Sequence, residues 1–531
     1  MRLLQACAAT VGVALSATGL GAPVVARAAH PTSGPEEEGG AAALAAGKWS
    51  ALPTAPLAAR DGESFLWTGQ ELLVWGGSSG VDPDSDPRSF GDGAGYDPTT
   101  RHWARMAPSP LSPREGAAAV WAGEAAFFWG GDQPTADEPR YLASGALYYP
   151  STNTWRRLPA APIGARSGAV ASWTGASVVV FGGSDHNGAG TVPLGGASFD
   201  LATGKWEKLP PWPRTLPGEP ISTSAVWTGH ELLAFVTDMD TVRASCPKPC
   251  VYSTTTSVRA EVAAWAPGQR SWQVLPGAPN NTPDASFTAY AQALWTGHEA
   301  LLIGGGGCLP GEFCPLQVQP DGGSLAYDPA NGYWHQLGVG VGGNKTWPVV
   351  WTGSALTVID MSRYRSNPPP FTAPGAGAAF DLASGTWLAL PHAPVAQLQT
   401  PVSVWTGRQE LTWGATSAGQ TQGAALTSAP GDITSSGASG HLDGVARFCP
   451  PPGFSKAPAG LVLTISAAGA GHPTAYQFVT APFWFHFALA PGHYVVRAKG
   501  DFGPAAQAQA EVHEGSTAQV DTTCSSSGDA P

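Results

Sequence analysis

The chain has 531 residues, of which 43% are hydrophobic and only 12% are charged, and its formal net charge is −12. A chain of this length and hydrophobic content can bury an extensive core, and it normally contains a repeat array or several domains. Because an acidic surface repels phosphate backbones, the composition argues against a nucleic-acid partner.

The N-terminal residues 1–28 have the features of a secretion signal. Arg2 precedes a long uncharged stretch, and Ala26-Arg27-Ala28 places small residues at a cleavage site. We therefore expect a secreted, extracellular protein in which residues 29–47 form a disordered linker. No later stretch holds about 18 consecutive apolar residues, so no membrane insertion is expected after the signal is removed.

Two series of tryptophans run through residues 48–430. One series opens a Trp-(Thr/Ala)-Gly tripeptide at spacings of 54, 52, 54, 68, 56 and 54 residues, and the other is usually followed by x-x-Leu-Pro. Short apolar runs bounded by Gly, Pro or Asp separate them and predict four antiparallel strands per unit. The first series is Trp67, Trp121, Trp173, Trp227, Trp295, Trp351 and Trp405; the second is Trp49, Trp103, Trp155, Trp206, Trp272, Trp334 and Trp387.

This repeat resembles the kelch repeat of β-propellers. The resemblance rests on the spaced tryptophans, on Tyr96-Asp97 and Tyr327-Asp328, and on Gly-Gly pairs. Units 4 and 6 have no such pair, and unit 7 has only Gly414-Ala415. It implies an all-β fold, with a seven-bladed propeller over residues 48–430. Because the last unit lacks a Trp strand and Trp49 has no unit of its own, we expect the start of the chain to complete the seventh blade. The Gly-Gly pairs are Gly76-Gly77, Gly130-Gly131, Gly182-Gly183 and Gly304-Gly305.

One face of such a propeller carries almost all the variation in loop length. With strands A to D counted from the inside outwards, the A–B and C–D turns are nearly constant, whereas the B–C and D–A connections vary. A rigid scaffold with variable loops on one face is the usual arrangement of a binding site. The B–C loops are expected at residues 78–94, 132–144, 184–195, 238–259, 306–323 and 360–375.

Three arginines on this face have two interpretations. Arg60, Arg114 and Arg166 each stand seven residues before the Trp of their unit, at the start of strand A. An arc of guanidinium groups would clamp a carboxylate or sulfate. Alternatively, the arginines are structural, since in kelch-like proteins an Arg at this position often holds backbone carbonyls between neighbouring blades.

The same face carries further candidate ligand-binding residues. Two tryptophans of the D–A connections, Trp212 and Trp347, are outside both series, and their rings, if exposed, would stack on a sugar or, alternatively, cap the edge of the propeller. The candidates are Asp185, His186, Trp212, Trp347, Arg363, Tyr364 and Arg365.

The cysteines and the C-terminal residues predict a second, disulfide-bonded domain. After the signal six cysteines remain, and an even number in an exported chain indicates disulfides. Residues 431–444 are expected to be a flexible linker, and residues 445–531 contain six short predicted strands. Pro491-Gly492-His493-Tyr494 with Val512-x-x-Gly515 resembles the prealbumin-like and carboxypeptidase-regulatory β-sandwiches, which implies an adhesion or spacing module. The expected pairs are Cys246 with Cys250, Cys308 with Cys314, and Cys449 with Cys524.

These features predict a binding protein that holds an extracellular glycan, peptide or protein ligand. The sequence has no nucleophile elbow, zinc-protease helix, Walker loop or dinucleotide fingerprint. The alternative is a carbohydrate-active enzyme, an epimerase, lyase or oxidase-like protein, with an arginine-rich site on the same face. Galactose oxidase, which is similar in its repeats, uses copper and a Cys–Tyr crosslink, but here every mature cysteine has a partner. We therefore expect no catalytic residue, metal or cofactor, and a monomer.

Overall fold

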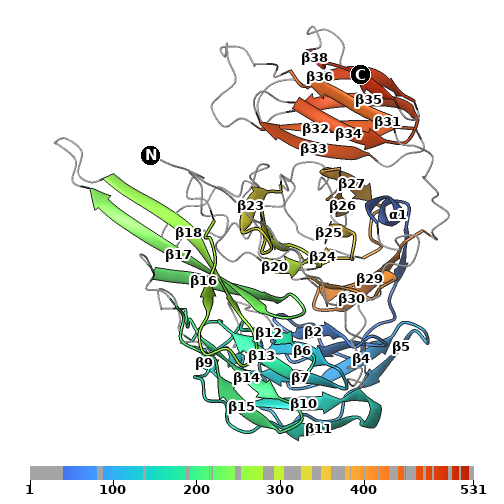
Figure 1. Ribbon diagram of the computed structural model, residues 1–531. Coiled ribbons are helices and arrows are strands. Elements are labelled where there is room, and N and C mark those ends of the chain that lie inside the picture. Colours follow the sequence, from blue (N-terminus) through green and yellow to red (C-terminus); the bar gives the residue numbers. More distant parts are fainter. Residues whose placement is uncertain are drawn as a thin grey trace, which may run out of the picture. The chain divides into compact units, whose positions relative to one another are not determined.

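The computed structural model describes most of the repeat region and parts of the C-terminal region. Its described part is all-β, with one short α-helix, α1 (Ala41–Ala45), and one 3-10 turn at Pro150–Thr152 (Figure 1). The described residues are 40–79, 88–135, 139–185, 192–213, 216, 219–244, 253–278, 292–303, 324–337, 348–359, 377–382, 384–395, 398, 401–416, 418–429, 440–447, 449, 462–470, 474–480, 484–499, 505–513 and 516–524.

Within the described residues, seven sets of four antiparallel strands follow the same order, and we number them as sheets 1 to 7. Six are separate four-stranded sheets, whereas the strands of sheet 6 are part of a nine-stranded sheet. Sheet 1 is β2 (Ser64–Trp67), β3 (Leu72–Trp75), β4 (Gly93–Asp97) and β5 (His102–Arg105); sheet 2 is β6 (Ala118–Ala122), β7 (Ala125–Trp129), β10 (Gly145–Tyr149) and β11 (Thr154–Arg157); sheet 3 is β12 (Val170–Trp173), β13 (Ser177–Phe181), β14 (Gly196–Asp200) and β15 (Lys205–Lys208). A small hairpin, β8 (Asp132–Gln133) and β9 (Arg140–Tyr141), lies within the connection between β7 and β10.

The remaining groups follow the same order. Sheet 4 is β16 (Glu219–Trp227), β17 (Leu232–Ala244), β18 (Ser253–Trp265) and β19 (Gln273–Val274); sheet 5 is β20 (Gln292–Trp295), β21 (Ala300–Ile303), β22 (Leu325–Asp328) and β23 (Tyr333–Gln336); sheet 6 is β24 (Val349–Trp351), β25 (Ala355–Ile359), β26 (Gly377–Asp381) and β27 (Thr386–Leu390); sheet 7 is β28 (Val402–Trp405), β29 (Gln409–Ala415), β30 (Thr421–Thr427) and β1 (Lys48–Ala51).

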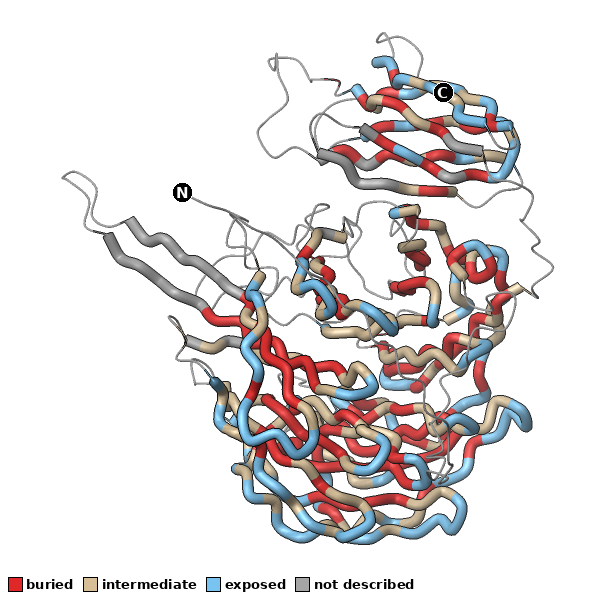
Figure 2. Tube along the Cα trace, viewed as in Figure 1, coloured by how far each residue is buried: buried red, intermediate tan, exposed pale blue. Residues whose placement is uncertain are grey.

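The first strands of successive sheets contact one another in a closed sequence. The contacts run from β2 to β6, β12, β16, β20, β24 and β28, and β28 contacts β2 again. Separate hydrophobic clusters lie between successive sheets, because side chains alternate between the two faces of each strand. Figure 2 shows the buried stretches along the strands of these sheets.

The tryptophans of the outer strands link each sheet to the preceding one. The indole Nε1 of Trp103 donates a hydrogen bond of 3.0 Å to Pro53 O, and that of Trp272 donates one of 2.9 Å to Pro210 O. The same contact recurs at Trp206 and Trp334, with distances of 3.1 and 2.8 Å. The x-x-Leu-Pro motif thus supplies the acceptor for the next tryptophan.

The predicted pairing of the chain start with the last repeat is confirmed. β1 pairs with β30 in antiparallel register, with Trp49 opposite Leu426. Trp49 Nε1 donates to Pro391 O at 2.7 Å, so this tryptophan makes the same contact with sheet 6 that the others make with their preceding sheets.

The predicted disordered linker over 29–47 is wrong for its last residues. Helix α1 lies within it, and Ala41 and Leu44 are buried against Leu390 and Leu426 of sheets 6 and 7. Residues 29–39 lie outside the described part. A run of alanines around one leucine forms a helix that burial on a neighbouring surface stabilises.

The loop predicted over 238–259 is also wrong, because most of it is strand. β17 and β18 pair continuously from Leu232 opposite Trp265 to Ala244 opposite Ser253. This stretch is rich in threonine and valine, whose branched side chains favour strands. Sheet 4 therefore extends well beyond its neighbours on the side of the long connections.

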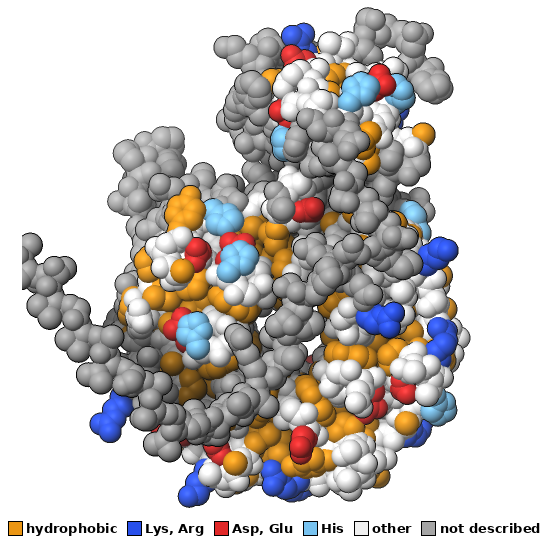
Figure 3. All heavy atoms as spheres, turned by 45° about the vertical axis from the view of Figure 1, so that its right-hand side comes forward, with side chains coloured by type: hydrophobic (Ala, Val, Ile, Leu, Met, Phe, Trp, Pro, Cys, Tyr) orange, Lys and Arg blue, Asp and Glu red, His pale blue; other side chains and the backbone are white. Residues whose placement is uncertain are grey.

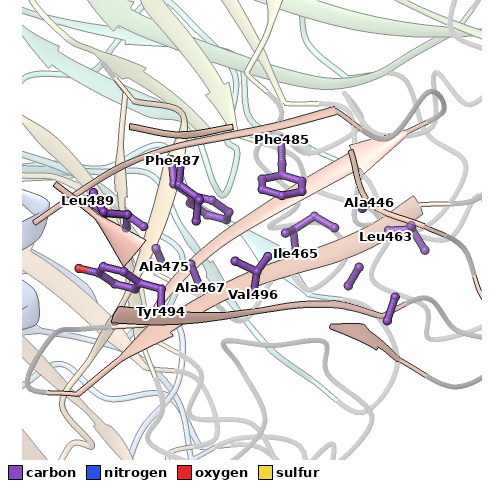
Figure 4. Close-up of a cluster of buried hydrophobic side chains, with 14 of the residues drawn as sticks. Ala446, Leu463, Ile465, Ala467, Ala475, Phe485, Phe487, Leu489, Tyr494 and Val496 are labelled. Atoms are coloured by element: carbon purple, nitrogen blue, oxygen red, sulfur yellow. The ribbon is translucent and has the colours of Figure 1, made fainter. Parts of the chain in front are cut away.

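The C-terminal residues form two further groups of strands that share one core. They are β31 (Gly440–Val445), β34 (Trp484–Leu489) and β37 (Thr517–Gln519), and β32 (Val462–Gly469), β33 (Ala475–Thr480), β35 (Gly492–Lys499), β36 (Ala506–Val512) and β38 (Thr523–Cys524). Figure 4 shows Phe485 and Phe487 facing Ile465 and Val496 across this core. β33 also pairs with β27 of sheet 6, with Tyr476 opposite Trp387.

Two predictions concern the boundaries of this region. Cys449 and Cys524 form the expected disulfide, with Cα atoms 5.7 Å apart. The linker predicted over 431–444 is wrong from Gly440 onwards, where β31 begins. Residues 430–439 lie outside the described part, as do the other two predicted cysteine pairs.

Candidate ligand-binding face

Three buried arginines occupy one position in sheets 1 to 3, just before the first strand. The exposed fractions of Arg60, Arg114 and Arg166 are 1%, 0% and 6%. In each, Nε donates to the carbonyl oxygen two residues earlier, at 2.9, 3.0 and 3.2 Å. Nη1 donates to the first glycine of the Gly-Gly pair, at 3.0, 2.8 and 3.0 Å. Nη1 also donates to the carbonyl oxygen of the residue just before the third strand. This residue is Asp92 in sheet 1, Ser144 in sheet 2 and Gly195 in sheet 3.

These contacts assign the arginines to the scaffold, as the structural interpretation expects. Each guanidinium ties the start of its sheet to the ends of the second and third strands, with backbone carbonyls accepting from Nε and Nη1. Nη2 of Arg114 donates to the hydroxyls of Ser112 and Ser144, whereas Nη2 of Arg60 is buried without a hydrogen-bond partner in the described part of the chain. Arg60 also lies 3.1 Å from the carboxylate of Asp92 and stacks 4.5 Å above the ring of Phe90. Burial and these backbone contacts favour the structural interpretation of the arginines over an anion clamp.

The Gly-Gly pairs make this arrangement possible. Gly76 and Gly130 have φ angles of 75° and 74°, a region that glycine adopts without steric cost. A Cβ atom on Gly76 would lie 2.7 Å from the carbonyl oxygen of Arg114, and one on Gly130 would lie 2.6 Å from that of Arg166. The glycines therefore allow the backbone of one sheet to approach the arginine of the next.

Acidic and hydroxyl side chains lie beside the arginines. The residue that directly follows each arginine is Asp61, Glu115 or Ser167. It exchanges two backbone hydrogen bonds of 2.8 to 3.0 Å with the residue after the Gly-Gly pair of the same sheet. The pairs are Asp61 with Ser78, Glu115 with Asp132, and Ser167 with Ser184. Adjacent sheets are joined here, since the N–H groups of Gly116 and Gly168 donate to the carbonyls of Gly62 and Gly116, both at 2.8 Å. We call Asp61, Glu63, Glu115 and Asp132 the acidic belt.

Burial and mutual repulsion raise the pKa values throughout the acidic belt. Burial is the main cause for Asp61, Glu115 and Asp132, and the negative charges of Asp132 and Asp61 add to the increase at Glu115. Hydroxyl groups oppose it, because Ser78 donates to Glu115 and Ser167 donates to Asp132. The belt thus places four carboxyl groups in sheets 1 and 2, of which Glu115 and Asp132 accept hydrogen bonds from serine hydroxyls.

Glu63 is the most strongly perturbed member of the belt. Its side chain is 9% exposed, and neither carboxylate oxygen has a hydrogen-bonding side chain as a partner in the described part of the chain. Burial raises its pKa to about 8 and the charge of Asp61 adds to this, while its own backbone N–H and Arg60 act in the opposite direction. Strongly perturbed carboxyl groups of this kind are concentrated at functional sites.

Reasoning from sequence missed the acidic belt, although it carries a readable signal. In units 1 and 2 an acidic residue stands between the arginine and a glycine, as Arg60-Asp61-Gly62 and Arg114-Glu115-Gly116. Because the arginine fixes the backbone register, the following residue must lie beside its counterpart in the next sheet.

Two of the other sequence candidates, Asp185 and Trp212, fall within the described part. Asp185 is exposed at the end of the described segment 139–185. Trp212 packs between Phe181 and Trp272, with ring centroids 6.0 and 5.4 Å away, so it caps the contact between sheets 3 and 4. The candidates outside the described part are His186, Trp347, Arg363, Tyr364 and Arg365.

The described residues contain no group of three or more His, Cys, Asp or Glu side chains arranged to hold a metal ion. Nor does this part include a helix with the length and hydropathy needed to cross a membrane. A scan against protein-family models finds no matching family, and a search of curated proteins finds no matching relative.

Proposed function

We propose that the chain is a secreted binding protein built as a seven-bladed, kelch-like propeller with a small C-terminal β-sandwich. The closed sequence of contacts from β2 through β28 and back to β2 supports a ring of seven blades. The pairing of β1 with β30 supports closure by the start of the chain. In a propeller of this topology the acidic belt lies on the face of the long B–C and D–A connections.

We further propose that this face binds a positively charged amine on a basic peptide or an amino sugar. The observation that carries this proposal is the acidic belt, with Glu63 buried and lacking a side-chain partner. The arginines are buried and their Nε and Nη1 groups donate to backbone carbonyls, so the carboxylates are the groups proposed to contact a ligand on this face. An ammonium group would neutralise the repulsion between these carboxylates and form charge-assisted hydrogen bonds with them.

The proposal is tested with matched cationic and neutral ligands on the full secreted chain. The probes are a chitosan hexasaccharide with free amines, its fully N-acetylated counterpart, and lysine-rich and acetyl-lysine peptides of the same sequence. We expect binding of the amines only, weakening as salt is added. Calorimetry that detects equal binding of the neutral analogues, or no binding of either amine, would contradict the proposal, and hydrolysis or epimerisation of the sugar would indicate an enzyme.

Variants distinguish amine binding at the acidic belt from a general attraction of amines to the negative net charge of the protein. Glu63→Gln and Glu115→Gln should each weaken amine binding about tenfold, whereas Glu124→Gln, an exposed acid in the turn after β6, should leave it unchanged. Because its raised pKa keeps Glu63 protonated at neutral pH, binding of the lysine-rich peptide, whose amines stay charged, should strengthen as the pH rises to about 8, where Glu63 ionises. The amines of chitosan lose their charge over the same range, so this pH test uses the peptide alone.

Export is tested separately by expressing the whole chain in a host that secretes proteins. We expect a monomer in the medium whose N-terminus follows Ala28, as measured by mass spectrometry and size-exclusion chromatography. Retention of Met1 in a cytosolic product would contradict secretion.

A further inference from the structure

A second group of side chains with ligand-binding chemistry lies on sheet 5. Tyr333 and His335 are on β23, the outer strand, and His298 and Glu299 are in the turn between β20 and β21. The turn between β20 and β21 is the A–B turn of sheet 5, and β23 begins directly after the C–D turn. The group therefore lies at the opposite end of the sheet from the long connections. Among the described parts of the surface, Figure 3 shows histidines next to acidic and hydrophobic side chains.

Two nearly parallel aromatic rings lie at the surface here, and that of Tyr333 is the more exposed. Tyr333 is 62% exposed, and within the described part of the chain only Val274 is also a large hydrophobic residue classed as exposed. The Tyr333 and His335 rings are nearly parallel, with an interplanar angle of 17° and centroids 6.1 Å apart. Trp334 between them points the other way and is buried, with its Nε1 bonded to Pro276 O at 2.8 Å. The alternation of the strand therefore holds both neighbouring rings on the outer face.

Polar groups suited to sugar hydroxyls border the rings. His335 Nε2 lies 3.0 Å from Glu299 Oε2, which fixes the carboxylate beside the imidazole. The other oxygen, Glu299 Oε1, lies 3.7 Å from Nε2 of His298, beyond hydrogen-bond distance. The His298 side chain is 76% exposed and that of Glu299 is 12% exposed, and Nδ1 of His298 lies 3.3 Å from Thr296 Oγ1, so a carboxylate and an exposed imidazole lie side by side.

The arrangement is specific to sheet 5 among the described outer strands. At the two positions that flank the outer tryptophan, the other sheets do not carry two rings. These pairs are His102 and Ala104, Thr154 and Arg156, Lys205 and Glu207, Ser271 and Gln273, Thr386 and Leu388, and Lys48 and Ser50. The core contacts of the repeat need only the tryptophan, so packing does not account for the exposed aromatic pair.

We propose that Tyr333, His335 and Glu299 form a platform for a neutral pyranose ring of a β-linked glycan. The apolar C–H face of such a sugar covers an aromatic ring, as the exposed Tyr333 ring requires. Glu299 accepts hydrogen bonds from adjacent hydroxyls, and His298 closes over the edge of the sugar. Anionic sugars are disfavoured by the Glu299 carboxylate and by the net charge of −12.

The test uses the full chain and neutral hexasaccharides: cellohexaose, laminarihexaose, xylohexaose and β-1,4-galactohexaose. We expect calorimetry and saturation-transfer NMR to detect binding of at least one, with the contacts on the C–H face of the sugar. Tyr333→Ala should weaken it at least tenfold, Tyr333→Phe about threefold or less, and Glu299→Gln at least fivefold.

Sheet 4 offers a matched control. His230 and Glu231 occupy the same turn with 3.6 Å between Nε2 and Oε1, but the outer strand there has no ring pair, so His230→Ala should leave glycan binding unchanged. Unchanged thermal unfolding of the Tyr333 variants will show that they are folded. The proposal is overturned if none of the four sugars binds, or if Tyr333→Ala binds as tightly as the wild type. It is independent of the acidic belt, whose variants should not affect this site.

Discussion

Arg114 is completely buried, yet each of its guanidinium nitrogens reaches an oxygen atom. Nε donates to Ser112 O at 3.0 Å, and Nη1 donates to Gly130 O and Ser144 O at 2.8 and 2.9 Å. Nη2 donates to the hydroxyls of Ser112 and Ser144 at 3.1 and 3.0 Å. Burial, with the nearby Arg157, lowers its pKa to about 10, so the group stays charged at neutral pH.

Lysine cannot replace this planar fork of donors. Arg114→Lys should leave several of these oxygens without a partner and lower the free energy of unfolding by about 2–4 kcal/mol. The measurement is urea unfolding, with Arg105→Lys as the control, since the Arg105 side chain is 62% exposed and should change little. Full stability of Arg114→Lys together with lost ligand binding would revive the anion clamp.

At the scale of elements, the backbone at the end of the second strand of one sheet lies against the arginine of the next sheet, and this close contact explains why glycines recur there. Gly76→Ala should destabilise the protein by more than 2 kcal/mol, because a left-handed backbone and a contact of 2.7 Å with Arg114 O act together. Gly69→Ala is the matched control, with a φ of 95° but no atom within 4 Å of the new Cβ, so it carries only the conformational cost. Equal unfolding midpoints for the two variants would show that the close approach does not matter.

A different interface between elements, that of sheets 6 and 7, contains a fully buried carboxyl group. Glu410 on β29 has the hydroxyls of Thr357 and Ser403 nearby, which lower its pKa, but burial acts more strongly and raises it from 4.5 to about 7. The folded protein therefore binds more protons here than the unfolded chain between these values, and this group's contribution to stability falls as the pH rises from about 4.5 through about 7.

Glu410→Gln should remove this fall in stability at higher pH, because glutamine does not ionise. Since one pKa unit corresponds to about 1.4 kcal/mol, the variant should be more stable than the wild type by up to about 3 kcal/mol at pH 8 and nearly equal to it at pH 4.5. Denaturant unfolding at both pH values measures this, with exposed Glu207→Gln as the control. A pH-independent difference would show that Glu410 does not titrate over this range.

At the scale of the whole molecule, features that repeat were predictable and features that occur once were not. The tryptophans repeat, so their periodicity predicted the strands, and the unmatched Trp49 predicted the pairing of β1 with β30. Helix α1 occurs once, in a segment with a linker-like composition, and only burial of Leu44 against other sheets stabilises it. The acidic belt and the Tyr333 platform depend on which residues face each other in neighbouring strands, which requires the register.

The pairing of β1 with β30 joins the start of the chain to sheet 7, and a pair of cysteines tests its register. Lys48 lies directly opposite Thr427, so Lys48→Cys with Thr427→Cys should form a disulfide in air and raise the unfolding midpoint. Ala51→Cys with Thr427→Cys is the control, because Ala51 pairs with Ala424 and lies about 10 Å along the strand from Lys48, beyond the reach of a disulfide. Peptide mapping under non-reducing conditions identifies the linked residues. If the second pair crosslinks as readily as the first, or if neither does, β1 does not hold this register and the sheets are not closed by the start of the chain.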